Sequence, residues 1–169
     1  NPETRSTRSL LALGFEPDDA LFVDSMLADQ SASLRQKGRV LFDARSRPEF
    51  GPVAERFNAG QVVESEVAGQ RVRVSGLVEL GPSFGADGNL ITSRETFRSL
   101  LPSTSRGSIE LGLIRLRDGA DPEAVAQRLR AWLPNDVSVF TKKAFIEFEK
   151  NYWRSSTAIG FIFSLGAAM

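Results

Sequence analysis

The sequence contains no cysteine and no histidine, and its charges balance. The absence of cysteine excludes disulfides, thiol redox chemistry and thiolate metal sites, and it fits a periplasmic or a cytosolic location equally well. The absence of histidine excludes Ser-His-Asp and Cys-His catalysis, His-ligated zinc and the usual proton carrier at neutral pH. With 21 basic and 21 acidic residues, the chain lacks the basic excess that is typical of a nucleic-acid binder. We therefore expect no nucleic-acid partner.

Motifs for other kinds of chemistry are also missing. The glycines of residues 81–88 do not have the spacing of a phosphate-binding loop, and there is no G-x-S-x-G or S-x-x-K motif. The acidic clusters Asp18-Asp19 and Asp87 with Asn89 offer too few oxygens for calcium and are predicted to form turns instead. Glu147 and Glu149 would lie on different helix faces, which does not suit an acid/base pair. We expect no cofactor, no metal and no catalytic activity.

The pattern of apolar residues predicts an α+β fold. The 169 residues suit one domain, or one domain with an inserted lobe. Runs and alternations of apolar residues predict strands at residues 10–15, 39–43, 62–80 (a hairpin), 90–91, 108–116 and 137–139. Helical spacing predicts helices at residues 19–34, 46–60, 92–102, 121–133 and from 142 onward.

The clearest local signals lie in the turns and caps. A turn at Ala68-Gly69 places two Glu–Arg pairs across the hairpin, which fixes its register. Ser46 with Glu49 has the form of a capping box, and Asp121 and Thr141 are expected N-caps. Residues 108–139 then read as strand, helix, strand, a βαβ unit with parallel strands, in which Trp132 is expected to face the core.

The end of the sequence changes character. Residues 142–154 are amphipathic, whereas residues 157–169 carry no charge, and a helix apolar on all sides must be buried in protein or lipid. Tyr and Trp flanked by basic residues are typical of a membrane interface. We expect an interfacial belt of Lys150, Tyr152, Trp153 and Arg154, followed by a transmembrane helix that includes Ile159, Phe161, Ile162, Phe163 and Leu165. Both ends are then expected to be cuts in a longer protein.

Three colinear stretches carry a family resemblance: VSGLVELGPSFGADGNLITS (residues 74–93), the run from SIELGLIRL to FEKNYW (residues 108–153), and STAIGFIFSLGAAM (residues 156–169). ALGFEPDDALF and RVLFDARSRPEFG add to them. Together these stretches resemble the permease subunit of DevC-type ABC exporters, which belongs with the MacB-like and FtsX-like permeases.

The resemblance implies an architecture. Such permeases hold a large extracytoplasmic domain between their first and second transmembrane helices, with a porter lobe of βαβ units and a second lobe inserted into it. Here residues 1–15 would end the first porter half and residues 16–106 would form the inserted mixed α/β lobe. Residues 107–141 would be the second porter unit, and residues 142–169 the stalk and the truncated membrane helix.

The resemblance also implies partners and a location. The permease would be a homodimer in the bacterial inner membrane, with this domain in the periplasm and in contact with the lipid bilayer. A separate ABC ATPase subunit, a periplasmic membrane-fusion (adaptor) protein and, indirectly, an outer-membrane channel would complete a path for a lipid-like or glycolipid-like substrate. Phe84 and Asp87, in a turn-rich loop, are the expected adaptor contact. The alternative is a soluble α+β binding domain whose last helix is buried in its core.

Overall fold

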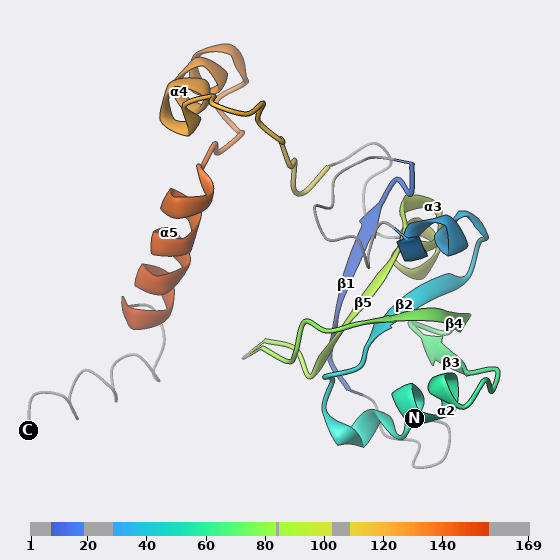
Figure 1. Cartoon of the computed structure of the whole chain (residues 1–169). Helices are drawn as coiled ribbons and strands as arrows, with labels where there is room; N and C mark the ends of the chain where they lie inside the picture. The colour runs from blue at the N-terminus through green and yellow to red at the C-terminus, as the bar shows by residue number, and fades with distance from the viewer. Residues whose placement is uncertain (1–7, 19–28, 84, 103–108, 156–169) are drawn as a thin grey trace, which may run out of the picture. The chain divides into compact units, whose positions relative to one another are not determined.

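The computed structural model describes residues 8–18, 29–83, 85–102 and 109–155, and it divides the chain into two compact units, residues 1–113 and 114–169. The mixed α/β composition agrees with the predicted α+β class (Figure 1). Each unit is described by itself below. The division falls seven residues after residue 106, where the resemblance places the end of the inserted lobe.

Unit 1 is built on a five-stranded mixed sheet in the order β1-β5-β2-β4-β3. Its strands are β1 (Leu10–Phe15), β2 (Arg39–Asp43), β3 (Glu64–Val67), β4 (Gln70–Val78) and β5 (Gly88–Ser93). β1 is parallel to β5 and β2 is parallel to β4, while β2–β5 and β3–β4 are antiparallel. All five positions were predicted as strands. Within the segment assigned to the first porter half, residues 10–15 are therefore an edge strand of this sheet.

The β3–β4 hairpin has the predicted register. Glu64 lies opposite Arg73 and Glu66 lies opposite Arg71. Ala68 and Gly69 both have positive φ, the conformation that lets a two-residue turn follow the twist of the strands. In β4 a bulge at Ser75 breaks the alternation, so that Val74 and Leu77 pack on the same face of the sheet.

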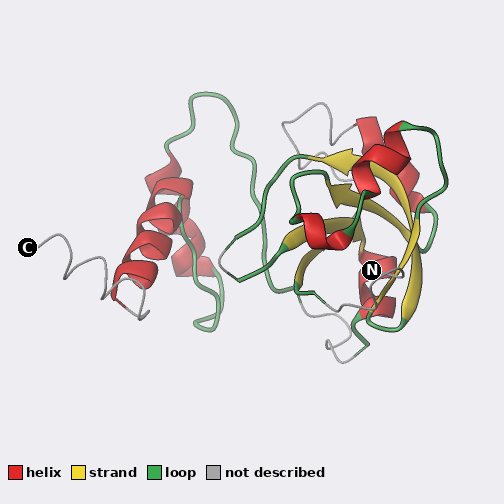
Figure 2. Ribbon diagram, turned by 90° about the horizontal axis from the view of Figure 1, so that it is seen from below, coloured by secondary structure: helices red, strands yellow, loops and turns green. Residues whose placement is uncertain are grey.

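Short helices cover the two faces of the sheet (Figure 2). One face holds a core that includes Leu100 of α3 (Arg94–Leu100) and packs against η2 (Pro48–Phe50) and α2 (Val53–Asn58). The opposite face holds Leu41, Val78 and Ile91 against Leu34 of η1 (Ala32–Arg35). The predicted helix 19–34 is described only from residue 29, and its last turn is a 3-10 helix.

The helix expected from Ser46 takes a different form. Ser46 makes no capping bond, and its buried Oγ has no hydrogen-bond partner among the described residues, so the capping box is wrong. The chain forms one 3-10 turn, adopts positive φ at Gly51 and begins again as α2 after Pro52. Proline disfavours helical geometry in the residue before it, which explains the interruption. Ser93 is the N-cap of α3, because its side chain accepts a bond from the Thr96 N–H.

Unit 2 contains two helices, α4 (Pro122–Trp132) and α5 (Lys142–Ser155). The predicted caps are confirmed: the Asp121 side chain accepts from the Glu123 N–H, and Thr141 Oγ1 accepts from the Ala144 N–H. The strands predicted at residues 108–116 and 137–139 are wrong, because residues 109–116 and 137–140 form no sheet pairing in the described structure. Alternating apolar residues can form a strand only where a neighbouring strand is available.

Candidate functional site

The loop expected to contact an adaptor is held by a buried carboxylate. Asp43, at the end of β2, is fully buried. Its oxygens accept bonds from the N–H groups of Arg45 (3.0 Å), Leu80 (3.0 Å) and Gly81 (2.8 Å), and from Asn89 Nδ2 (2.7 Å). A buried carboxylate needs this number of donors to replace its lost water. Asp43 and Asn89 thus fix both ends of residues 80–88.

Asp87 binds within its own unit. Its carboxylate accepts from Arg47 Nε at 3.0 Å, its carbonyl accepts from the Arg47 N–H, and its own N–H donates to the Ser9 carbonyl. The side chain of Asp87 is only 25% exposed. These bonds make Asp87 a loop anchor, and a docking role would compete with Arg47. Phe84, its expected partner in the site, lies outside the described residues.

In unit 2, Thr141 forms a joint between the two helices. It is buried, and it donates from Oγ1 to Glu123 Oε1 at 3.0 Å while the same oxygen caps α5. At the other end of α4, Arg130 donates twice to the carbonyl of Val139, at 3.0 and 2.8 Å. Residues 139–141 are therefore bonded to both ends of α4. The start of α5 is fixed to α4 without a free linker.

Three phenylalanines extend this joint along α5. Phe140, Phe145 and Phe148 form a cluster with ring centroids 5.3 to 6.5 Å apart, distances at which aromatic rings attract one another. All three remain exposed by more than two fifths. Phe145 and Phe148 belong to the segment 142–154 that was predicted to be amphipathic, whereas Phe140 precedes the helix.

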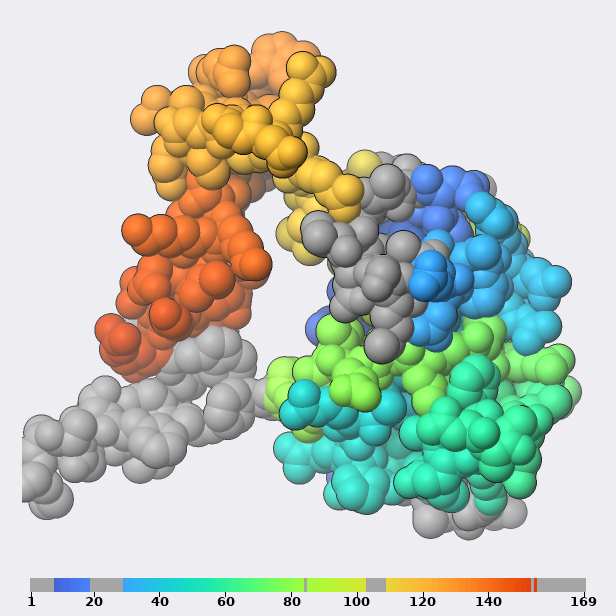
Figure 3. Space-filling view, viewed as in Figure 1, coloured from blue at the N-terminus to red at the C-terminus, as the bar shows by residue number. Residues whose placement is uncertain are grey.

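The apolar side chains of unit 2 are largely uncovered. Only Ala126 and Thr141 are buried among its described side chains. Trp132, predicted to face the core, is 83% exposed, because no described segment of the unit packs over the end of α4. Figure 3 shows the side chains of α4 and α5 at the surface. The exposed apolar residues of unit 2 are Ile114, Trp132, Val137, Phe140, Phe145, Ile146, Phe148 and Tyr152. Exposed apolar side chains that gather in one patch are typical of a contact surface, and the ring contacts of Phe140, Phe145 and Phe148 form such a patch.

The predicted membrane-interface residues lie in the last turns of α5. Lys150, Tyr152 and Arg154 are exposed, and Lys150 pairs with Glu147 at 3.0 Å, an exposed pair of small energetic value. The side chain of Trp153 and the five predicted transmembrane residues, Ile159, Phe161, Ile162, Phe163 and Leu165, lie outside the described part. Within the residues that are described, no helix has both the length and the apolarity needed to cross a bilayer.

No group of three or more acidic side chains that could hold a metal ion exists in the described ranges. Asp18 lies in a turn, as predicted, and pairs with Arg35 at 2.6 Å. Asn89 belongs to a strand rather than to a turn. The fold is thus a mixed α/β fold with two contact candidates, the loop at Asp87 and the apolar surface of unit 2. Comparisons with protein-family models, curated proteins and solved structures find no significant match.

Proposed function

We propose that the chain is the extracytoplasmic domain of an ABC exporter permease, with a porter-like unit and an inserted mixed α/β lobe. The observation that carries the proposal is the set of exposed apolar side chains in unit 2, many of which lie on the amphipathic helix α5. The sequence of α5 leads into the uncharged residues 157–169. Such a helix places its aromatic and basic end at the lipid interface. The residues that would line this interface are Lys150, Tyr152, Trp153 and Arg154.

In this function the domain transmits movement. The bonds of Thr141 to Glu123 and of Arg130 to Val139 support a rigid joint, so that a displacement of α5 would carry α4 with it. ATP hydrolysis would take place in a separate cytoplasmic subunit, and the domain would dock a periplasmic adaptor for the export of a lipid-like or glycolipid-like substrate. The permease would act as a homodimer in the bacterial inner membrane.

A flotation experiment with lipid vesicles tests the membrane part of the proposal. The full chain should float with neutral phosphatidylcholine vesicles, and the same chain ending at Ser155 should stay in the soluble fraction. Neutral lipid is used because the chain has no net charge. If the full chain stays soluble, or if the shortened chain unfolds, the last segment is a core helix and the alternative of a soluble binding domain holds.

Co-purification tests the transport part. The full-length permease, expressed with the ATPase and adaptor encoded beside it, should be recovered in one complex from detergent. The variant Thr141→Val should keep this complex but lower the ATPase stimulation by adaptor, since the joint and not the docking surface is changed. Recovery of the permease alone would contradict the proposal.

A further inference from the structure

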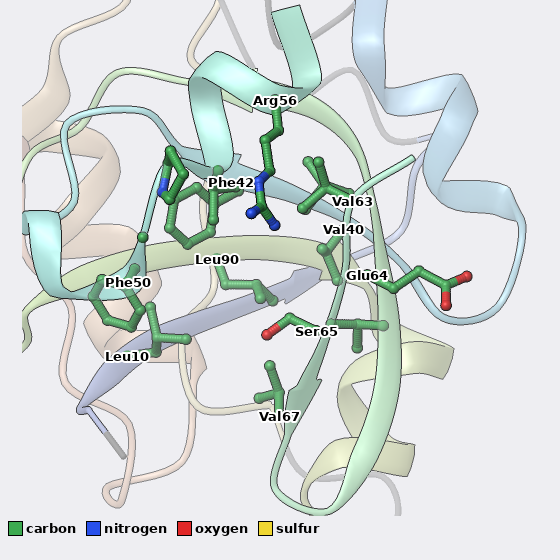
Figure 4. Close-up of a pocket in the computed structure, with 15 residues that line it drawn as sticks. Leu10, Val40, Phe42, Phe50, Arg56, Val63, Glu64, Ser65, Val67 and Leu90 are labelled. Carbon is green, nitrogen blue, oxygen red and sulfur yellow. The ribbon is translucent and has the colours of Figure 1, made fainter. Parts of the chain in front are cut away.

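A small open cavity lies on the α2 face of the sheet in unit 1. Its volume is about 60 Å³. Figure 4 shows its floor, formed by side chains of the sheet that include Val40, Phe42 and Leu90. These three side chains are at most 8% exposed and belong to the core of this face. The cavity is therefore an opening into the core rather than a surface dimple.

The cavity exists because the cover of this face is short. α2 has six residues, and the positive φ of Gly51 followed by Pro52 separates it from η2. Phe50 fixes η2 to the sheet through an edge contact with Phe42, at a centroid distance of 5.8 Å. Val53 and Phe57 fix α2 over the same core. The space between these attachments and β3 is left unfilled.

The polar groups of the cavity are few and differ in direction. In Figure 4 the guanidinium of Arg56, on α2, points into the opening between Phe42 and Val63, and the hydroxyl of Ser65 also points inward. In Figure 4 the carboxylate of Glu64 points away from the other labelled side chains. Its ion-pair partner is Arg71, at 4.0 Å. The opening thus presents an apolar floor with a cation at its mouth.

We propose that this cavity receives one aliphatic side chain of a protein partner, with an acidic residue next to it bonded to Arg56. An engineered cavity of about 150 Å³ holds a benzene ring, so a volume of about 60 Å³ suits valine, leucine or isoleucine and excludes an aromatic ring or a long acyl chain. A guanidinium has five donors and binds a carboxylate with paired, charge-assisted bonds, even when it serves another partner as well. This inference does not depend on the proposed transport function.

Blocked tetrapeptides test the proposal on the full chain. The probe is acetyl-Gly-Leu-Asp-Gly-amide, and the readout is the methyl NMR shifts of Val40, Val74 and Leu90 during titration to millimolar concentration. The shifts should saturate with the Leu-Asp peptide. A Leu-Asn peptide, which lacks the charge, should bind with about tenfold lower affinity. A Trp-Asp peptide, which is too large for the cavity, should cause no shifts.

Two variants and a matched control complete the test. Arg56→Gln should lower the affinity for the Leu-Asp peptide about tenfold. Ser65→Leu should abolish binding, because the leucine side chain would fill the cavity. Arg71→Gln, which removes an exposed arginine that does not line the cavity, should leave binding unchanged. Unchanged amide spectra outside the cavity establish that each variant is folded.

Three results would overturn the proposal. One is the absence of saturable shifts with the Leu-Asp peptide in the folded chain. Another is equal weakening by Arg56→Gln and Arg71→Gln, which would mean unspecific attraction of an anion. The third is tighter binding of free 3-methylbutanoate than of the peptide, which would make the cavity a site for a small branched acid.

Discussion

Unit 1 and unit 2 have similar local signals but very different cores. In unit 1 both faces of a five-stranded sheet are packed, and Leu34 and Leu41 have no exposed surface. In unit 2 the two helices carry correct caps and an amphipathic pattern, yet only two described side chains are buried. Caps and periodicity are thus enough to set helix bounds, whereas a core requires a second layer.

The difference separates two kinds of role. A unit with a complete core keeps its shape alone and can present a loop or a cavity at a fixed place. A unit whose apolar side chains are exposed gains stability only when another surface covers them. Each unit should therefore respond to substitution in its own way, and the substitution of largest expected effect lies in unit 1.

Leu41→Ala should be the most damaging change. Leu41 lies in the centre of the sheet without exposed surface, and removal of such a side chain leaves a cavity. We expect a loss of about 2–5 kcal/mol in the free energy of unfolding of unit 1. Urea unfolding followed at the amide NMR signals of β2 measures it, and the signals of α5 should shift their midpoint little. A loss below about 1 kcal/mol would contradict the packed core.

Asp43→Asn should cost less, about 1–3 kcal/mol. Asparagine has the same size, but its NH₂ group is a donor. It cannot accept a bond from N–H groups, such as those of Leu80 and Gly81, that now donate to a carboxylate oxygen. The same unfolding measurement checks the value, with the exposed Asp118→Asn as the control. Equal stability of the two variants would mean that the carboxylate does not hold the loop.

Thr141→Val should weaken unit 2 by about 1 kcal/mol, because it removes the cap of α5 together with the bond to Glu123. Thr141→Ser keeps the hydroxyl and should therefore retain most of the stability that the valine variant loses. Hydrogen exchange of the first turn of α5 measures both variants. Identical exchange in the valine and serine variants would refute the joint.

Trp132→Ala should have the smallest effect, within about 0.5 kcal/mol, because an 83% exposed side chain contributes little to the stability of its own unit. Thermal unfolding of the full chain checks it, with Ala131→Ser as a neighbouring exposed control. A loss of more than about 2 kcal/mol would mean that the tryptophan is packed.

The sequence predicted what short-range physics controls. The Ala68-Gly69 turn, the register of the hairpin and the caps at Asp121 and Thr141 depend on neighbours in the sequence, and all are confirmed. The parallel pairing of β1 with β5 joins segments nearly 80 residues apart, and no local pattern indicates it.

Most of the errors concern contacts with distant segments; the Ser46 capping box is the exception, because a local pattern predicted it and the chain forms a 3-10 turn there instead. The alternation of Ile109, Leu111 and Leu113 indicates which side chains want burial but not whether a partner strand exists, so the strand was predicted where the described structure has none. Trp132 on a helical stripe was misplaced for the same reason. The Asp43–Asn89 bond gives no sequence signal, since each residue alone resembles a turn former. The cavity at Arg56 arises because α2 is short. The sequence predicted one longer helix over residues 46–60, so it could not indicate the cavity.

Amide hydrogen exchange of the full chain, with and without phosphatidylcholine vesicles, tests the central comparison most directly. Without vesicles we expect slow exchange in β2, β4 and β5 and exchange at least about a hundredfold faster in α4 and α5, since protection follows local stability. With vesicles α5 should become protected while unit 1 stays unchanged. Slow exchange in α5 without any lipid would contradict the account, because unit 2 would then have a core of its own.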